Sequence, residues 1–91
     1  MEFSLIQLKT LLDHGLTMAD ITAIQGSWSR HAATVAGMER MERMAQARRL
    51  SDQAADGDTI ALKLAKLLNE VGEGLPSAAF SAAALSYALD H

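Results

Sequence analysis

Cysteine is absent from this chain of 91 residues, and aromatic side chains make up only 4% of it. Without cysteine, disulfide bridges and thiolate metal sites are excluded, which suits a reducing compartment. The scarcity of aromatic residues, together with the abundance of alanine, leucine and methionine, favours helices over β-sheet. The chain is therefore expected to be all-α.

Long hydrophobic runs are also lacking. The most apolar segment, from Leu75 to Leu89, is shorter than the ~20 residues that a membrane-spanning helix needs. The N-terminal stretch up to Gly15 has neither a basic leader nor a small-residue cleavage signal, so it does not read as a secretory peptide. We expect a soluble cytoplasmic protein with no membrane partner.

Positive charge is scarce over the whole chain, which has a formal net charge of −3. This balance argues against a generic nucleic-acid-binding protein. The segment from Ser29 to Leu50 is the exception, because its arginines outnumber its two glutamates. A solvated helix surface is the simpler interpretation of this basic segment.

Apolar residues make up 49% of the chain, which is ordinary for a globular protein. A chain this short buries only about 60–65% of the surface that its unfolded form exposes, so a single core is marginal and self-association would help. We predict one helical domain over residues 1–91 that self-associates.

Four of the five predicted helices are short or of moderate length. They span about Ser4–His14, Thr17–Gly26, Thr59–Val71 and Ser77–Leu89. Glycine follows or ends each of the first three, at positions 15, 26 and 72. Gly57 supplies a positive φ in the turn that begins near Asp52, and Asp58 is placed to cap the helix that follows. The last helix is apolar on nearly all sides, so it is either central or covered by another subunit.

The longest predicted helix runs from Ser27 to Ser51, with Ser27 or Ser29 as its N-cap. We expect it to be the long central element, with two helices packed at each end. Its methionines share one face with Ala45, and methionine adapts its shape to irregular partners. The other helices are too short to cover this whole face. We therefore predict an interface with a partner protein or a second subunit, formed by Met38, Met41, Met44, Ala45, Phe80 and Tyr87.

The segment from Gly15 to Val35 resembles a helix-turn-helix motif, because a short helix, a glycine turn at Gly26 and a second helix follow one another. The motif implies DNA binding by the first turn of the second helix. Here that turn would offer Trp28, Ser29, Arg30 and His31. The segment departs from the motif at Thr22, where alanine is usual. It also departs on both sides of Gly26, because Gln25 and Ser27 stand where the motif has apolar residues.

Residues suited to catalysis or metal binding are few. The chain has three histidines and no glycine-rich phosphate loop, and Asp56 and Asp58 lack a recognisable base or nucleophile beside them. The acidic turn suggests a calcium loop, but Ala54 and Lys63 stand where two of the oxygen ligands belong. We expect no enzymatic activity, metal, cofactor or small-molecule substrate.

Two functions remain open. The preferred one is a small regulatory or adaptor protein that binds another protein through apolar helix faces and forms a homo-oligomer. The alternative is a helix-turn-helix DNA-binding regulator. Burial of Trp28, with a methionine face that is exposed or paired across subunits, favours the first. Exposure of Trp28, Arg30 and His31, with a dimer interface on the C-terminal helix, favours the second.

Overall fold

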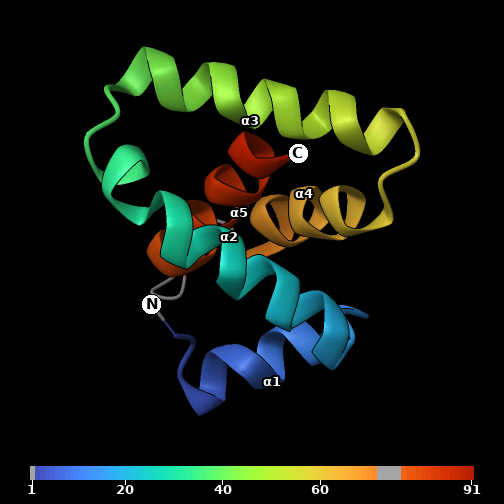
Figure 1. The fold of residues 1–91 in the computed structure, drawn as a ribbon. Helices are drawn as coiled ribbons and strands as arrows, with labels where there is room; N and C mark the ends of the chain where they lie inside the picture. Colours follow the sequence, from blue (N-terminus) through green and yellow to red (C-terminus); the bar gives the residue numbers. More distant parts are fainter. Residues whose placement is uncertain (1, 72–76) are drawn as a thin grey trace.

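Five α-helices and no strand make up the described part of the chain, residues 2–71 and 77–91 of the computed structural model (Figure 1). The helices are α1 (Leu5–Asp13), α2 (Met18–Ala36), α3 (Arg40–Ala55), α4 (Thr59–Val71) and α5 (Ser77–Asp90). They form one compact all-α domain, which confirms the predicted fold class and the number of helices. The turn predicted from Gly72 to Pro76 lies outside the described residues.

Capping side chains fix the starts of three helices. At α1 the Ser4 hydroxyl accepts from the Gln7 amide at 3.2 Å, and the Gln7 side chain accepts from the Ser4 amide at 2.8 Å. Thr17 and Asp20 make the same reciprocal pair at α2. One carboxylate oxygen of Asp58 accepts from two amides in the first turn of α4. The predicted caps at Thr17 and Asp58 are confirmed.

Two glycines adopt the left-handed conformation predicted for them. Gly15, which follows α1, has φ +85°, and Gly57, between α3 and α4, has φ +103°. A side chain at either position would be strained, because only glycine visits this region at little cost. These two turns fix where α1 and α3 stop.

The predicted single helix from Ser27 to Ser51 is wrong. α2 continues through Gly26 as far as Ala36. Residues 37–39 are not helical, and α3 begins at Arg40. Ser27 and Ser29 therefore lie inside α2 and cap no helix. α3 then continues past Asp52, where a turn was expected, to Ala55.

Arg43 stabilises the break between α2 and α3. Its guanidinium donates to the carbonyl oxygens of Val35 at 3.1 Å and Met38 at 3.2 Å. Carbonyl groups at a helix end have no partner within the helix, and a cation there also complements the helix dipole. One arginine of α3 thus holds the end of the preceding helix.

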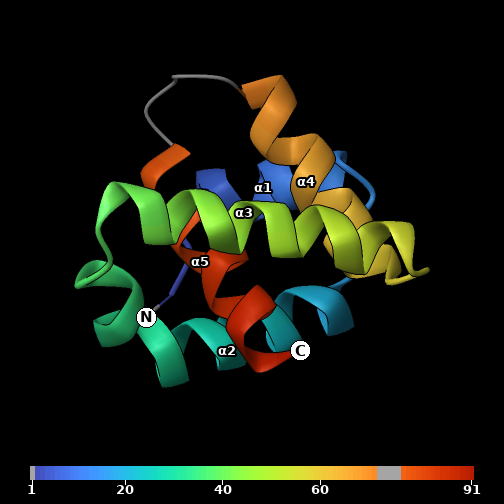
Figure 2. The ribbon, with the colours of Figure 1, turned by 90° about the horizontal axis from the view of Figure 1, so that it is seen from above.

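The central helix is α5, and not the basic segment for which that place was predicted. Figures 1 and 2 show α5 between α2, α3 and α4, with α3 outermost on one side of the molecule. Small residues allow these neighbours to approach closely. The buried side chains of α5 are Phe80, Ala83, Ala84, Leu85, Ser86, Tyr87 and Ala88.

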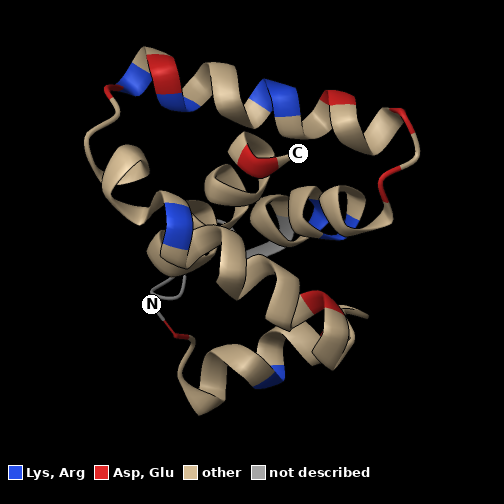
Figure 3. Ribbon diagram, in the orientation of Figure 1, with Lys and Arg blue, Asp and Glu red and all other residues tan. Residues whose placement is uncertain are grey.

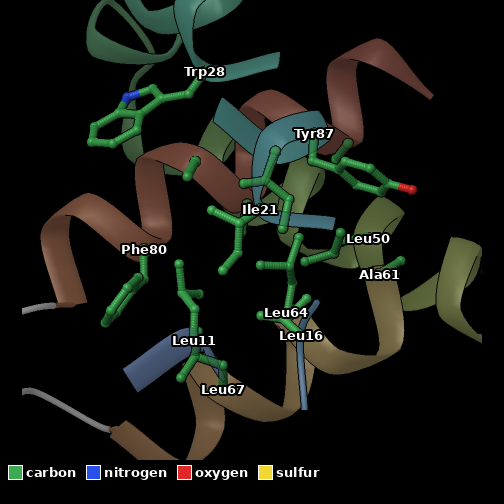
Figure 4. Packing of buried hydrophobic residues seen from close by; sticks show 14 of the residues in the cluster. Leu11, Leu16, Ile21, Trp28, Leu50, Ala61, Leu64, Leu67, Phe80 and Tyr87 are labelled. Atoms are coloured by element: carbon green, nitrogen blue, oxygen red, sulfur yellow. The ribbon is translucent and has the colours of Figure 1, made fainter. Parts of the chain in front are cut away.

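All five helices contribute to the hydrophobic core (Figure 4). Leu11, Ile21, Leu50, Leu64, Leu67 and Phe80 are among its largest fully buried side chains. Phe3, which precedes α1, also joins the core: its ring lies 5.0 Å from that of Trp28 and 5.9 Å from that of Phe80. No described helix combines the length and the apolar character of a membrane span.

Candidate functional site

Trp28 is a core residue. Only 8% of its surface is exposed, and its ring packs against that of Phe3. The turn at Gly26 that the helix-turn-helix resemblance requires is wrong, because α2 runs through this glycine without interruption. Trp28 therefore lies in the middle of one helix and points away from solvent.

Arg30 and His31, two of the candidates for DNA contact, are held by Asp90 at the end of α5. Arg30 donates to one carboxylate oxygen of Asp90, and His31 Nε2 lies 3.0 Å from the other. The buried hydroxyl of Ser27 donates to the same carboxylate at 2.8 Å. Ser29, the remaining candidate, is exposed. Three side chains of α2 thus converge on the last residue of α5.

The hydrogen bonds of this cluster shift the ionisation of both charged partners. Donation by Arg30, then by His31 and Ser27, holds the pKa of Asp90 well below its usual range. The hydrogen bond to Asp90 raises the pKa of Arg30 in turn. Asp90 therefore stays ionised at any ordinary pH and ties the C-terminus of α5 to the middle of α2.

This grouping of serine, histidine and aspartate does not form a nucleophile and base. The Ser27 hydroxyl donates to Asp90 and not to His31, and its residue is fully buried. A nucleophilic serine needs a base within hydrogen-bond reach and access to the substrate. The cluster is therefore an interhelical contact.

The predicted methionine face lies on the outside of α3. Met41 and Met44 are 82% and 62% exposed, and Ala45 beside them is also exposed. The opposite side of α3 carries its one buried residue, Leu50. Met38 lies in the break before the helix and is partly buried, so it does not continue this face. We call the side chains of Met41, Met44, Ala45 and Arg48 the α3 outer face.

Phe80 and Tyr87, the other two predicted interface residues, belong to the domain's own core. The Tyr87 hydroxyl donates to Asp58 at 2.7 Å, so it links α5 to the cap of α4. Burial, aided by this hydrogen bond, raises the pKa of Tyr87 well above its usual range. Neither side chain is available at the surface of this domain.

A second exposed apolar face lies on α1, and sequence reasoning missed it. Leu5, Leu8 and Leu12 recur at helical spacing with Leu11 beside them, yet Leu5 and Leu12 are exposed and Leu11 is buried. Ile6 is 76% exposed beside Leu5, which is 85% exposed. The apolar residues of α1 surround the helix, so periodicity alone did not show which side faces the core. We call Leu5, Ile6 and Leu12 the α1 outer face.

An apolar cleft of about 430 Å³ lies between α2 and α5, and no sequence pattern predicted it. Trp28, Val35 and several alanines line it, and Arg43 is the one charged residue among the lining side chains. Arg43 is already engaged with the carbonyl oxygens of Val35 and Met38. The cleft therefore offers few polar groups to orient a small ligand.

No three His, Cys, Asp or Glu side chains within residues 2–71 and 77–91 are grouped so that they could hold a metal ion. Asp58, part of the suggested calcium loop, uses its oxygens for the α4 cap and for Tyr87. Fold and surface together define an all-α domain with two exposed apolar helix faces. Comparison with models of protein families, with curated proteins and with solved structures gives no match.

Proposed function

We propose that this protein is a small cytoplasmic adaptor or regulator that acts by binding other protein molecules through apolar helix faces. The observation that carries the proposal is the exposure of Met41 and Met44 on the side of α3 that points away from the core. Large apolar side chains that gather on one exposed face mark interaction surfaces. Methionine suits such a surface because its flexible side chain adapts to the shape of a partner.

The position of the α1 outer face supports an adaptor role. α1 and α3 lie on opposite sides of the molecule, with α2, α4 and α5 between them (Figures 1 and 2). Two apolar faces so far apart can be covered by two partners at the same time. A regulator with a single partner needs only one of them.

DNA binding, the alternative function, has less support. Arg30 is already paired with Asp90, His31 is also engaged by this carboxylate, and Trp28 lies in the core. A cation that is paired within the protein contributes little to phosphate binding unless the pair opens. The alternative predicts that the protein binds some DNA duplex at low salt and that Arg30→Ala weakens this binding.

The proposed function is tested by capturing partners from an extract of the native host with tagged protein. The double variant Met41→Glu/Met44→Glu should fail to capture a protein that the wild type binds, because two carboxylates then replace the apolar contact. The matched control is Met18→Glu, which makes the same chemical change at another exposed methionine. Circular dichroism checks that all three proteins have the same helix content and melting temperature.

Loss of one partner by the α3 variant, with retention by the Met18→Glu control, would support the α3 outer face. The corresponding pair Leu5→Glu/Ile6→Glu tests the α1 outer face. If both double variants retain every partner of the wild type, neither apolar face is the binding surface and the proposal is wrong.

A further inference from the structure

Two exposed charges of α3 with opposite signs, Glu42 and Arg49, indicate what covers its outer face. The other exposed charged residues of this helix are Arg40, Arg48 and Asp52. Figure 3 shows charges of both signs distributed along α3. Among the described residues, none of these five side chains forms an ion pair within the domain. Their charges are therefore free to meet those of another molecule.

Glu42 and Arg49 are seven residues apart, so they lie on the same flank of the outer face, separated by two helical turns. In an antiparallel pair of helices, residues on the same flank of each helix face one another across the contact. With a two-fold axis beside Ala45, Glu42 of each copy meets Arg49 of the other. The same axis brings Met44 and Ala45 close to their own counterparts.

We propose that a second copy of this chain docks on the α3 outer face, with the two α3 helices antiparallel and related by a two-fold axis beside Ala45. This inference rests on the proposed function, because it names the partner of the same surface. In a parallel pair the same flanks lie on opposite sides of the contact, so Glu42 and Arg49 would not meet each other across it. The antiparallel pair instead forms two equal ion pairs, one on each side of Met44 and Ala45, as a self-complementary two-fold contact requires. Arg48, the charged member of the outer face, lies beside this centre and stays partly in solvent.

The contact is small, so the dimer should be weak. α3 has 16 residues and is about 24 Å long, and one helix of this length buries less than the ~1,000 Å² expected of a stable interface. We expect a dissociation constant on the order of 100 μM, rising with salt because the two ion pairs are exposed to solvent.

The test uses two variants, each of which reverses one of the two charges. Their self-association is measured by sedimentation equilibrium up to about 1 mM protein. Glu42→Arg alone places arginine opposite arginine, and Arg49→Glu alone places glutamate opposite glutamate. Each variant should dimerise at least about tenfold more weakly than the wild type. In an equal mixture of the two variants, both contacts again join arginine to glutamate. A heterodimer as strong as the wild-type homodimer should therefore form.

Lys66→Glu, at an exposed position of α4, makes the same change in net charge as Arg49→Glu and should leave the dimer intact. A wild type that remains monomeric at 1 mM would overturn the second-copy proposal. The proposed function would still stand if Met41→Glu/Met44→Glu loses a host partner. A dimer that neither charge variant weakens, or a mixture that forms no heterodimer, would refute the antiparallel α3 contact.

Discussion

α3 and α5 are opposite extremes of the same kind of sequence, a helix without a clear apolar stripe. α5 has one charged residue, Asp90, and buries most of its length between three other helices. α3 is rich in charge and buries only Leu50. A helix that is apolar on all sides lies inside a domain, and one that is polar on most sides lies outside.

The comparison shows why length and basic charge were poor guides to the centre of this domain. The segment from Ser27 to Ser51 was predicted to be central because it is long and its methionines share one face. Those properties show that a segment can be helical, but they do not show how much of it can be buried. The alanine-rich segment from Ser77 to Asp90 had the composition of a central helix.

Removing a large side chain from α5 should cause the largest loss of stability. Phe80→Ala leaves a cavity beside Phe3 in the core and should lower the free energy of unfolding by about 3–5 kcal/mol. Met44→Ala on α3 should change it by less than about 0.5 kcal/mol, because Met44 is exposed. Urea denaturation of both variants measures the difference. Equal losses would mean that the two helices do not differ in burial.

Within α3, the inner and outer sides should differ almost as strongly. Leu50→Ala should lower the free energy of unfolding by about 2–5 kcal/mol, since Leu50 is the one buried residue of this helix. Its neighbour Arg49 is exposed, and Arg49→Ala should have an effect within about 0.5 kcal/mol. The same urea titrations test the pair. A Leu50→Ala variant as stable as Arg49→Ala would show that α3 is held by other contacts.

The smallest expected effect concerns Asp90, the polar end of α5, and it depends on pH. Its pKa is lower in the folded protein than the ordinary 3.8, so ionised Asp90 stabilises the fold above about pH 4. This contribution is lost as the pH falls through the lower folded pKa. Asp90→Asn should therefore have a lower free energy of unfolding than the wild type at pH 6. This difference in the free energy of unfolding should be smaller at pH 2.5.

Urea denaturation at the two pH values provides the measurement, and the matched control is Asp56→Asn. Asp56 is exposed, and among the described residues its side chain makes no ion pair. If the difference in the free energy of unfolding between wild type and Asp90→Asn is the same at both pH values, the carboxylate does not stabilise the fold through its charge.

Several local features could be predicted from the sequence because they depend on neighbouring residues. The positive φ of Gly15 and Gly57 and the caps at Thr17 and Asp58 are of this kind. The range of α4 was also predicted correctly, since its leucines and isoleucine recur on one side. Each of these signals lies within about one or two helical turns.

The choice between Gly26 and Gly37 could not be made locally. Each glycine lowers helix stability by about 1 kcal/mol relative to alanine, so both are equally plausible ends. α2 continues through Gly26 because the next two residues, Ser27 and Trp28, are buried against distant parts of the chain. It ends near Gly37, where Arg43 from the next helix binds the terminal carbonyl groups.

The candidate surface was predicted in part. Met41, Met44 and Ala45 do lie on an exposed face of α3, whereas Phe80 and Tyr87 are in the core. The burial of those two rings depends on where α5 lies, which no local pattern specifies. The α1 outer face was missed for the same reason.

The sequence by itself determined that the chain is helical, where α1 and α4 begin, and that two glycine turns follow α1 and α3. Propensity, capping and left-handed glycine act between residues close in the chain. Only the tertiary structure decided that α5 is central, that α3 is peripheral, and that Arg30 and His31 are paired with Asp90. About 60 residues separate the partners of that pairing, so only the close approach of α2 and α5 brings them together.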